Sequence, residues 1–447
     1  MFIVPRLRGG RNAGGKEGEV SVYRINGGIP VSGTVRVSGN KNAALPCIAA
    51  TLLTDEPVVL RNIPAIEDVS VMLSLLQCLG STVVYLDGHS LQITSGSRQG
   101  RLPSELFDAV RGSILLAGPL AASTEGVRLP PPGGDVIGLR RLDTHFIGLS
   151  ALGAACTVEG GGLLHIHAPG RLRGADVFLD EASVTATENV IMAAVSAEGH
   201  TVIRNAASEP HVQDLCTMLN SMGASISGIG SNLLTIEGVE GLHGCDFTIG
   251  CDFMEVGSFI GLAAATKGDI YIEGVDTYQF PMIRLGFSRI GVRWEDVSTD
   301  TIHVPFEQER VLAKDLGGKT AKIDDAPWPG FPADLLSIMT VVATQMDGSI
   351  LIHEKMFESR MFFIDWLIRM GADIVLCDPH RAVVNGPCKL HGAIVTSPDV
   401  RAGMALVIAA LCADGRTDIQ NIYQIERGYE GLADKLLALG ADIERLA

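Results

Sequence analysis

The sequence lacks any cysteine pair spaced as C-x-x-C, although it contains nine cysteines. Cys245 and Cys251 come closest, and no histidine cluster accompanies them. This pattern argues against a disulfide framework and against the usual zinc modules, and it favours reduced thiols in a cytoplasmic protein. We expect no metal and no cofactor.

Long hydrophobic runs are also missing. The longest apolar stretches, 335–346 and 402–413, are too short to span a bilayer and are typical of core helices. Residues 1–19 are rich in Gly and Arg and have no apolar signal-peptide region, so we expect a flexible tail there.

Positive charge is scarce. The chain has 35 Lys and Arg against 51 Asp and Glu, a formal net charge of −16. Such an acidic protein has no general attraction for nucleic acid or for an anionic membrane surface, so neither partner is expected. An anionic small-molecule substrate would have to be held by a local cluster of Arg and Lys. The oligomeric state stays open.

One unit recurs six times along the 447 residues, and each copy contains an apolar residue followed by Gly. Successive glycines are 73, 70, 68, 80 and 69 residues apart. This spacing is typical of a repeat architecture, in which neighbouring units bury a shared core. The marker glycines are Gly80, Gly153, Gly223, Gly291, Gly371 and Gly440.

Each unit begins with a helix that is apolar around its whole circumference and must therefore be buried on all sides. These helices are predicted at 43–53, 113–122, 189–197, 258–266, 335–344 and 403–412. Charged second helices and short β-branched strands, such as 201–204, follow them. Six units exceed one small core, so the sequence predicts an α/β protein with two groups of three units, helices inside and sheets outside.

Polar and charged residues mark the starts of the buried helices. Free backbone N–H groups and the positive end of the helix dipole make such starts suitable for anions. A cation there opposes the dipole and is expected to face an anion, whereas Thr185, Asp334 and Asp399 have the residue types of ordinary N-caps, which is the first interpretation of their positions. Residues 185–188 even have the form of a capping box. The marked starts carry Lys41-Asn42, Arg111, Thr185, Glu255, Asp334 and Arg401.

Several strings, in order from about Tyr23 to the C-terminus, resemble the UDP-N-acetylglucosamine enolpyruvyl transferases of the EPSP synthase/enolpyruvyl transferase family. The strings are Ser38-Gly-Asn-Lys-Asn-Ala-Ala-Leu-Pro46, Leu115-Ala-Gly-Pro-Leu120, Pro132-Gly-Gly-Asp-Val-Ile-Gly138, Ser183-Val-Thr-Ala-Thr-Glu-Asn189, Phe331-Pro-Ala-Asp334, Phe357-Glu-Ser-Arg360 and Glu426-Arg-Gly-Tyr-Glu430. The resemblance implies two inside-out α/β barrel domains, each of three repeated units, with the active site in the cleft between them. We expect residues 42–249, with a mobile loop at 130–142, in the first domain and residues 20–41 plus 250–447 in the second.

The resemblance also implies a reaction. Phosphoenolpyruvate would give its enolpyruvyl group to the 3′-hydroxyl of UDP-N-acetylglucosamine and release phosphate, by addition and elimination through a tetrahedral intermediate. This is the first committed step of peptidoglycan synthesis. The implied phosphoenolpyruvate-binding residues are Lys41, Asn42, Arg140, Arg360, Arg401 and Arg427. Those implied for the UDP-sugar are Asn42, Arg111, Arg140, Arg141, Leu142, Asp143, Thr144, Ser183, Val184, Asp334 and Met356.

The implied catalytic residues are Lys41, Asp334 as base for the 3′-hydroxyl, and Asp135 as acid for the methylene carbon of the donor. Asp135 stands where most members of the family carry cysteine. A free Asp has a pKa of about 3.9, so Asp135 can act as an acid only if loop closure buries it or a relay supplies the proton. We expect resistance to fosfomycin, whose epoxide alkylates that cysteine.

The chain departs from the family strings mainly on the acceptor side. Thr185 replaces the usual Gly of the S-V-G-A-T string, and Phe253 stands where Arg is frequent. Glu181, Arg141 and Gln424 are further departures. Two alternatives therefore stay open: an enolpyruvyl transferase for another uridine nucleotide such as UMP in secondary metabolism, and a non-catalytic UDP-sugar-binding paralogue. A 3-phosphoshikimate enolpyruvyl transferase is disfavoured, because its helix start usually reads Lys-Ser and not Lys41-Asn42.

Overall fold

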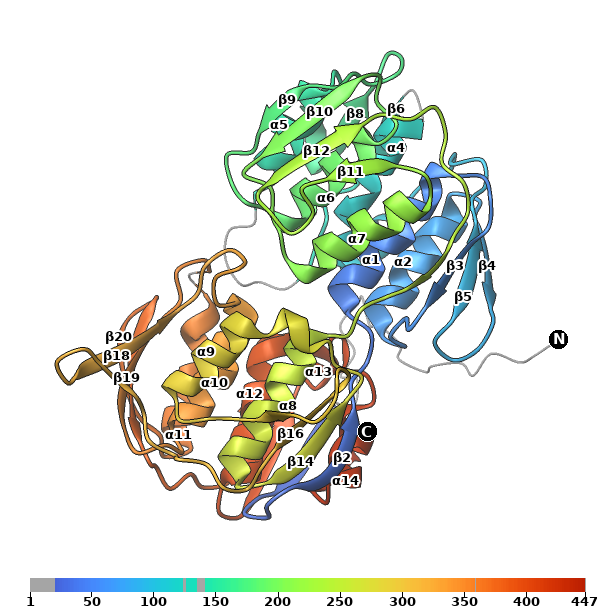
Figure 1. Ribbon diagram of the computed structural model, residues 1–447. Coiled ribbons are helices and arrows are strands. Elements are labelled where there is room, and N and C mark those ends of the chain that lie inside the picture. Colours follow the sequence, from blue (N-terminus) through green and yellow to red (C-terminus); the bar gives the residue numbers. More distant parts are fainter. Residues whose placement is uncertain (1–20, 124–125, 135–140, 358, 447) are drawn as a thin grey trace.

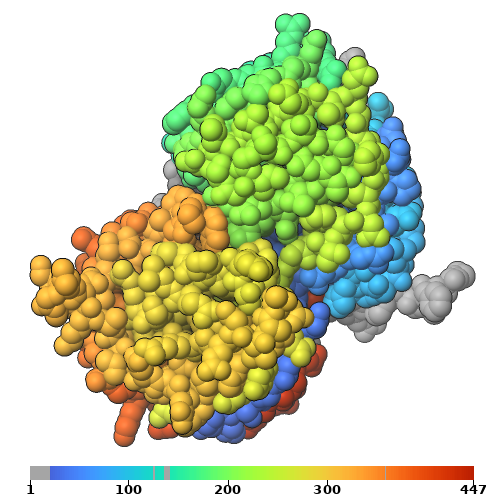
Figure 2. Space-filling model, in the orientation of Figure 1, coloured from blue at the N-terminus to red at the C-terminus, as the bar shows by residue number. Residues whose placement is uncertain are grey.

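The computed structural model describes residues 21–123, 126–134, 141–357 and 359–446. They form two lobes that lie against each other (Figures 1 and 2). One hydrophobic core gathers residues between Ala43 and Ile249, and the other combines residues between Tyr23 and Val37 with residues between Cys251 and Ile443. On this basis we propose two domains divided at residues 41/42 and 249/250.

The first domain has three apolar segments at its centre: α1 (Lys41–Ala50), the short 3₁₀ helix η2 (Arg111–Leu116) continuing into α4 (Ala117–Ser123), and α6 (Val184–Ala194). Around them lie α2 (Glu67–Cys78), α3 (Ser104–Ala109), α5 (Asp143–Ala151) and α7 (Pro210–Ser221). The strands are β3 (Val58–Arg61), β4 (Thr82–Tyr85), β5 (Leu91–Thr94), β6 (Gly126–Leu129), β7 (Ala155–Val158), β8 (Leu164–His167), β9 (Asp176–Phe178), β10 (His200–Arg204), β11 (Ser225–Ser227), β12 (Leu233–Glu237) and β13 (Asp246–Thr248). They form three sheets, β13-β3-β5-β4, β6-β8-β7 and β11-β12-β10-β9.

The second domain repeats this plan. Its central helices, α8 (Phe253–Thr266), α10 (Leu336–Ala343) and α12 (Val400–Cys412), all contact one another. Outer helices are α9 (Pro281–Arg289), α11 (Ile364–Arg369), α13 (Tyr423–Glu426) and α14 (Leu432–Ala438). The strands are β1 (Val22–Asn26), β2 (Ser32–Arg36), β14 (Asp269–Glu273), β15 (Glu295–Asp296), β16 (Thr301–Val304), β17 (Lys314–Asp315), β18 (Lys319–Asp324), β19 (Gly348–His353), β20 (Asp373–Asp378), β21 (Arg381–Gly386), β22 (Ile394–Thr396), β23 (Arg416–Gln420) and β24 (Asp442–Leu446). Their sheets are β15-β16-β14-β2, β17-β18-β19-β21-β20 and β22-β23-β1-β24. The predicted α/β class, with buried helices and outer sheets, is confirmed.

The six marker glycines share one backbone conformation. Their φ angles lie between 73° at Gly291 and 100° at Gly371, and each follows the last turn of an outer helix. A residue with a side chain adopts this left-handed conformation at a cost, so Gly is the usual residue after a helix end. The repeat is therefore visible in the sequence because the same helix stop is used six times.

Four central helices begin earlier than predicted. α1, α6, α8 and α12 start at Lys41, Val184, Phe253 and Val400, because their first turns contain polar residues that the apolar pattern does not include. The predicted capping box at residues 185–188 is wrong. Ser183 is the N-cap of α6, and its hydroxyl accepts a hydrogen bond from the N–H of Ala186 at 3.5 Å.

The chain passes between the two domains twice, and the two connecting segments lie side by side. Asn40 donates its N–H to the carbonyl of Gly250 at 2.8 Å, and Asp252 donates to the carbonyl of Ser38 at 2.9 Å. Asn40 and Asp252 are also the N-caps of α1 and α8. Both helices therefore begin at the junction, which brings their first turns to the space between the lobes.

All nine cysteines lie in the described residues, and none of them forms a disulfide. Within the same residues, no group of three His, Cys, Asp or Glu side chains is placed to hold a metal ion. No helix there has the length and apolar character needed to cross a membrane.

Candidate active site

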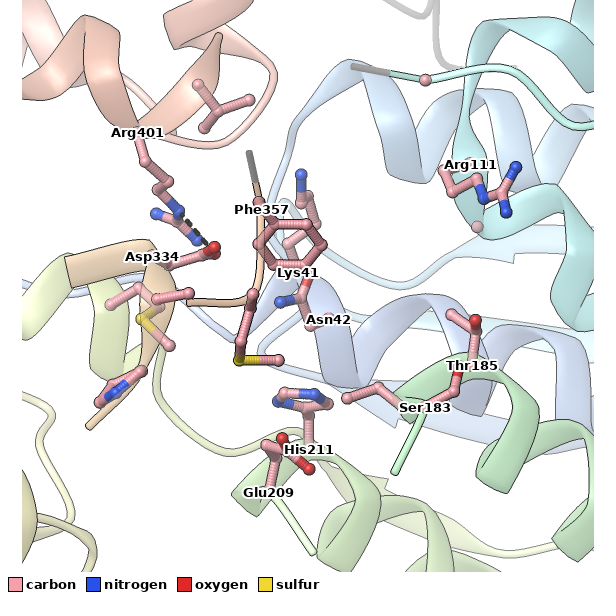
Figure 3. Close-up of a pocket in the computed structure, with 18 of the residues that line it drawn as sticks. Lys41, Asn42, Arg111, Ser183, Thr185, Glu209, His211, Asp334, Phe357 and Arg401 are labelled. Carbon is pink, nitrogen blue, oxygen red and sulfur yellow. Dashed lines mark hydrogen bonds and ion pairs between the residues drawn. The ribbon is translucent and has the colours of Figure 1, made fainter. Parts of the chain in front are cut away.

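A cavity of about 340 Å³ lies between the two domains and is lined by residues of both. The starts of α1 and α6 contribute from the first domain, and the segment before α10 and the start of α12 from the second (Figure 3). The cavity gathers most of the described residues that the sequence singled out. They are Lys41, Asn42, Arg111, Arg141, Ser183, Val184, Asp334, Met356, Arg360, Arg401 and Arg427.

Asp334 is held between two arginines. Its carboxylate contacts Nη2 of Arg360 at 2.6 Å and Nε of Arg401 at 3.3 Å. Burial alone would raise the pKa of Asp334, but the charges of Arg360 and Arg401 outweigh burial and hold the pKa well below its usual range. Asp334 lies in the 3₁₀ turn η5 (Ala333–Leu335) and is not an N-cap, so its carboxylate is available to the cavity.

The two arginines keep unused donors. Nε of Arg360 and Nη1 of Arg401 are buried and have no hydrogen-bond partner in the described part of the chain. Arg401 also lies 3.7 Å from the carboxylate of Asp252, and its guanidinium stacks 5.0 Å from the ring centre of Tyr429. A buried N–H group without a partner is costly. Both arginines line the cavity, so an anionic ligand bound there would meet their guanidinium groups.

Asp68 joins two further cations across the domain junction. Its carboxylate accepts from Nζ of Lys41 at 3.2 Å and from Nε of Arg427 at 2.8 Å. Asp68 belongs to the first domain and Lys41 stands at the proposed domain boundary, whereas Arg427 follows α13 in the second domain. Arg427 also donates to Gln424 at 3.2 Å and to the carbonyl of Ala109 at 3.3 Å. Asp68 therefore sets the distance between two cations that line the cavity.

The first turn of α6 forms the opposite edge. Figure 3 shows Ser183 and Thr185 along this edge, on the same side of the view as Arg111. Nη1 of Arg111 donates to the carbonyl of Pro132 at 3.3 Å. Glu188, one turn further along α6, also lines the cavity, and burial raises its pKa well above the usual range.

Other predicted residues are placed elsewhere. Leu142, Asp143 and Thr144 do not line the cavity: Asp143 pairs with Arg141 at 2.9 Å, and the Thr144 hydroxyl donates to Asp180 at 2.7 Å. Glu255 is buried inside α8, where it pairs with Lys435 at 2.6 Å. Asp135 and Arg140 lie outside the described residues. The residue before Asp135, Gly134, lines the cavity.

Three aromatic side chains at the cavity were not predicted from the sequence. The ring of His211 stacks on Phe253 with centres 6.2 Å apart, and Phe253 lies 5.7 Å from Trp328. His211 comes from α7 and the other two from the second domain, so this contact also bridges the lobes. Burial lowers the pKa of His211 to about 4, against an opposite effect of Asp334. Phe253, which departs from the family strings, is thus explained by its packing against His211 and Trp328. Both partners lie more than 40 positions away in the sequence, so the sequence alone does not reveal the contact.

The sequence profile described as EPSP synthase (3-phosphoshikimate 1-carboxyvinyltransferase) matches residues 25–436. The chain belongs to this family.

Several curated relatives within the family are more than 50% identical to this chain. The UDP-N-acetylglucosamine 1-carboxyvinyltransferase of Treponema denticola is 58% identical over 424 residues, covering 94% of this chain and 98% of the relative. The protein of the same name from Treponema pallidum is 58% identical, and it covers 95% of this chain and 99% of its own length. That of Bradyrhizobium diazoefficiens is 52% identical, with 95% and 98% covered. The family predicted from the strings is therefore confirmed.

Solved structures of the family share the architecture. The enolpyruvyl transferase NikO from Streptomyces tendae superposes with a TM-score of 0.83 at 25% identity, covering 96% of this chain and 99% of its own. EPSP synthase from Acinetobacter baumannii has a TM-score of 0.75 at 17% identity, with 96% and 100% covered, and bears on the fold alone. The predicted enolpyruvyl transferase fold is confirmed.

For this family member we predict that Asp68→Asn lowers kcat by roughly tenfold to a hundredfold, because a misplaced pair of cations no longer meets the donor in one pose. The KM for phosphoenolpyruvate should not rise, since losing a carboxylate makes the site more positive. Steady-state kinetics check both parameters.

The matched control is Asp55→Asn, which removes an exposed ion pair with Arg98. We expect its kcat within about twofold of the original, because exposed ion pairs contribute little. Equal loss in both variants, or an unchanged kcat in Asp68→Asn, would contradict the positioning role of Asp68.

Proposed function

We propose that this enzyme transfers the enolpyruvyl group of phosphoenolpyruvate to the 3′-hydroxyl of UDP-N-acetylglucosamine and releases phosphate. The observation that carries the proposal is the 58% identity, over nearly the whole chain, to relatives named for this reaction. The arrangement of Asp334, Arg360 and Arg401 between the domains supports it, because the donor carries two anionic groups and the acceptor a hydroxyl that must lose a proton.

The donor fits the cations of the cavity. Lys41 and Arg427, with Arg140, would bind its phosphate, while Arg360 and Arg401, with Arg427, would surround its carboxylate. Planar guanidinium groups hold carboxylate and phosphate oxygens in fixed geometry.

The acceptor would occupy the edge formed by α6 and the 3₁₀ helix η2. Asn42 and the backbone of Met356 would bind the amino sugar, and Arg111, Arg140, Arg141, Ser183 and Val184 the nucleotide. Glu188 and Glu209 lie nearby, and burial raises the pKa of both carboxyl groups.

The chemistry then proceeds in two steps. Asp334 accepts the proton of the 3′-hydroxyl while the hydroxyl oxygen attacks C2 of phosphoenolpyruvate. Asp135 protonates C3, and the tetrahedral intermediate results. The bond between C2 and the phosphate oxygen then breaks, the Asp135 carboxylate takes a proton back from C3, and the enol ether and phosphate leave. As the donor's anions draw Arg360 and Arg401 away from Asp334, its pKa rises and the carboxylate becomes a stronger base.

We further propose that the protein is cytoplasmic, that it acts in cell-wall synthesis and that it is resistant to fosfomycin. Small-molecule substrates are those of the family, and we propose neither a nucleic acid nor a membrane partner.

The proposal is tested by phosphate release from phosphoenolpyruvate in parallel with UDP-N-acetylglucosamine, UMP and shikimate 3-phosphate. We expect release with the UDP-sugar alone. Release only with UMP would move the protein to another uridine nucleotide and keep the mechanism. No phosphate release with any of the three acceptors, while the UDP-sugar still binds, would indicate a non-catalytic sensor.

A further inference from the structure

A chain of hydrogen bonds runs from α4 to the cavity edge, and we call it the Thr185 relay. The N–H of Gly118 donates to Oδ1 of Asn189 at 2.7 Å. Nδ2 of Asn189 contacts the carbonyl of Ile114 and Nδ1 of His145, each at 2.9 Å. Nε2 of His145 lies 3.2 Å from Oγ1 of Thr185. Asn189 is fully buried, and His145 is 2% exposed.

The direction of every bond in the relay follows from its first member. A backbone N–H can only donate, so the amide oxygen of Asn189 faces Gly118 and the NH₂ group faces His145. An NH₂ group also only donates, so Nδ1 of His145 is the acceptor. The single proton of a neutral imidazole then resides on Nε2 and is donated to the hydroxyl of Thr185.

His145 is held neutral by its surroundings. Burial lowers its pKa to about 3, with a smaller contribution in the same direction from the charge of Arg111. Packed against it are Asn189 on α6 and Thr185 at the cavity edge, neither of which carries a charge. The proton pattern of the relay is therefore constant across the physiological pH range.

Thr185 ends the relay at the cavity. Its oxygen accepts from His145, so its one hydroxyl proton is left to donate elsewhere. Thr185 is the second residue of the eleven-residue helix α6, whose first N–H groups and positive dipole end lie at the same place. The residue lines the cavity together with Ser183, Val184 and Arg111.

We propose that the Thr185 hydroxyl donates a hydrogen bond to a phosphate oxygen of the nucleoside diphosphate in the acceptor, with His145 and Asn189 as the residues that orient it. This deepens the proposed function and rests on it. Thr185 stands where the resembling strings carry Gly, so this chain adds a hydroxyl donor to the N–H groups at the start of α6. A phosphate is favoured over an uncharged group because Arg111 and the start of α6 both supply positive potential there.

Calorimetric titration of the full chain with UDP, without phosphoenolpyruvate, tests the inference. Thr185→Val keeps the shape and removes the hydroxyl, and we expect it to weaken UDP binding roughly tenfold, or about 1.4 kcal/mol. Thr185→Ser keeps the hydroxyl and should bind within about twofold of the original protein. In the Thr185→Val background, His145→Gln should cost no further affinity, whereas in the original background it should weaken UDP binding.

Each outcome has one meaning. If Thr185→Val binds UDP as tightly as the original protein, or if Val and Ser weaken it equally, the hydroxyl makes no such bond and the inference is wrong, while the proposed function stands. If the original protein itself does not bind UDP, the proposed acceptor is wrong. Since the Thr185 variants alone decide the inference, a His145 variant that fails to fold changes nothing.

Discussion

Asp334→Asn is expected to lower kcat roughly 10²–10⁴-fold, the usual contribution of a positioned general base. The substitution preserves the shape of the side chain and one oxygen acceptor for Arg360 or Arg401. It removes the group that takes the proton of the acceptor hydroxyl. Phosphate release at saturating phosphoenolpyruvate and UDP-N-acetylglucosamine measures the loss.

Binding should respond in the opposite sense to catalysis. Without the Asp334 carboxylate, the charges of Arg360 and Arg401 are less neutralised, and the anionic donor should bind as tightly as before or more tightly. A variant that is merely misfolded would lose donor binding together with kcat. The combination of a lower kcat and an unraised KM for phosphoenolpyruvate is therefore specific to the role of a base.

The control is Asp324→Asn, in the same segment of the chain. Asp324 pairs with Lys322 and Lys355 and does not line the cavity. Its loss should leave kcat within about twofold, as for other partly exposed ion pairs. A kcat of Asp334→Asn within tenfold of the original enzyme would remove Asp334 from the role of base.

The second large effect concerns fosfomycin. The original enzyme should keep its activity after prolonged incubation with the drug, whereas Asp135→Cys should be inactivated in a time-dependent manner. The rates should differ by roughly a hundredfold or more, because a thiolate is a far better nucleophile towards an epoxide than a carboxylate. Residual activity over time, with intact-mass measurement of the adduct, checks both forms.

A matched variant separates the nucleophile from its position. Asp55→Cys introduces a thiol at an exposed position of the first domain that does not line the cavity, and it should stay as resistant as the original enzyme. Adduct formation on Asp135 of the original enzyme, or inhibition at low drug concentration, would contradict the expected resistance. An Asp135→Cys enzyme that is active and resistant would contradict the placement of residue 135 beside the donor.

Much of the fold was predictable because one local device is repeated. The left-handed glycine after each outer helix and the wholly apolar central helices are both visible as residue types at regular spacing. The helix starts were predicted less accurately, because Thr185, Glu188 and Glu255 interrupt the apolar pattern although they lie inside helices. Their burial depends on neighbours that only the assembled domain supplies.

The site was predictable where a motif carries it and not where contacts between distant segments build it. Asp334 and Arg360 belong to recognisable strings. Asp68 has no such signal, because its importance comes from meeting Arg427 across 359 positions of sequence. The stacking of His211 on Phe253 likewise depends on the two domains coming together.

The central claim is that C2 of phosphoenolpyruvate becomes bonded to the 3′-oxygen of the UDP-sugar. We would determine the structure of the product by nuclear magnetic resonance after incubation with phosphoenolpyruvate labelled with ¹³C at C2. The account predicts a labelled enol ether coupled to the sugar proton at position 3′, with one phosphate released for each molecule formed. Labelled pyruvate beside unchanged UDP-N-acetylglucosamine, or a phosphorylated sugar, would contradict it.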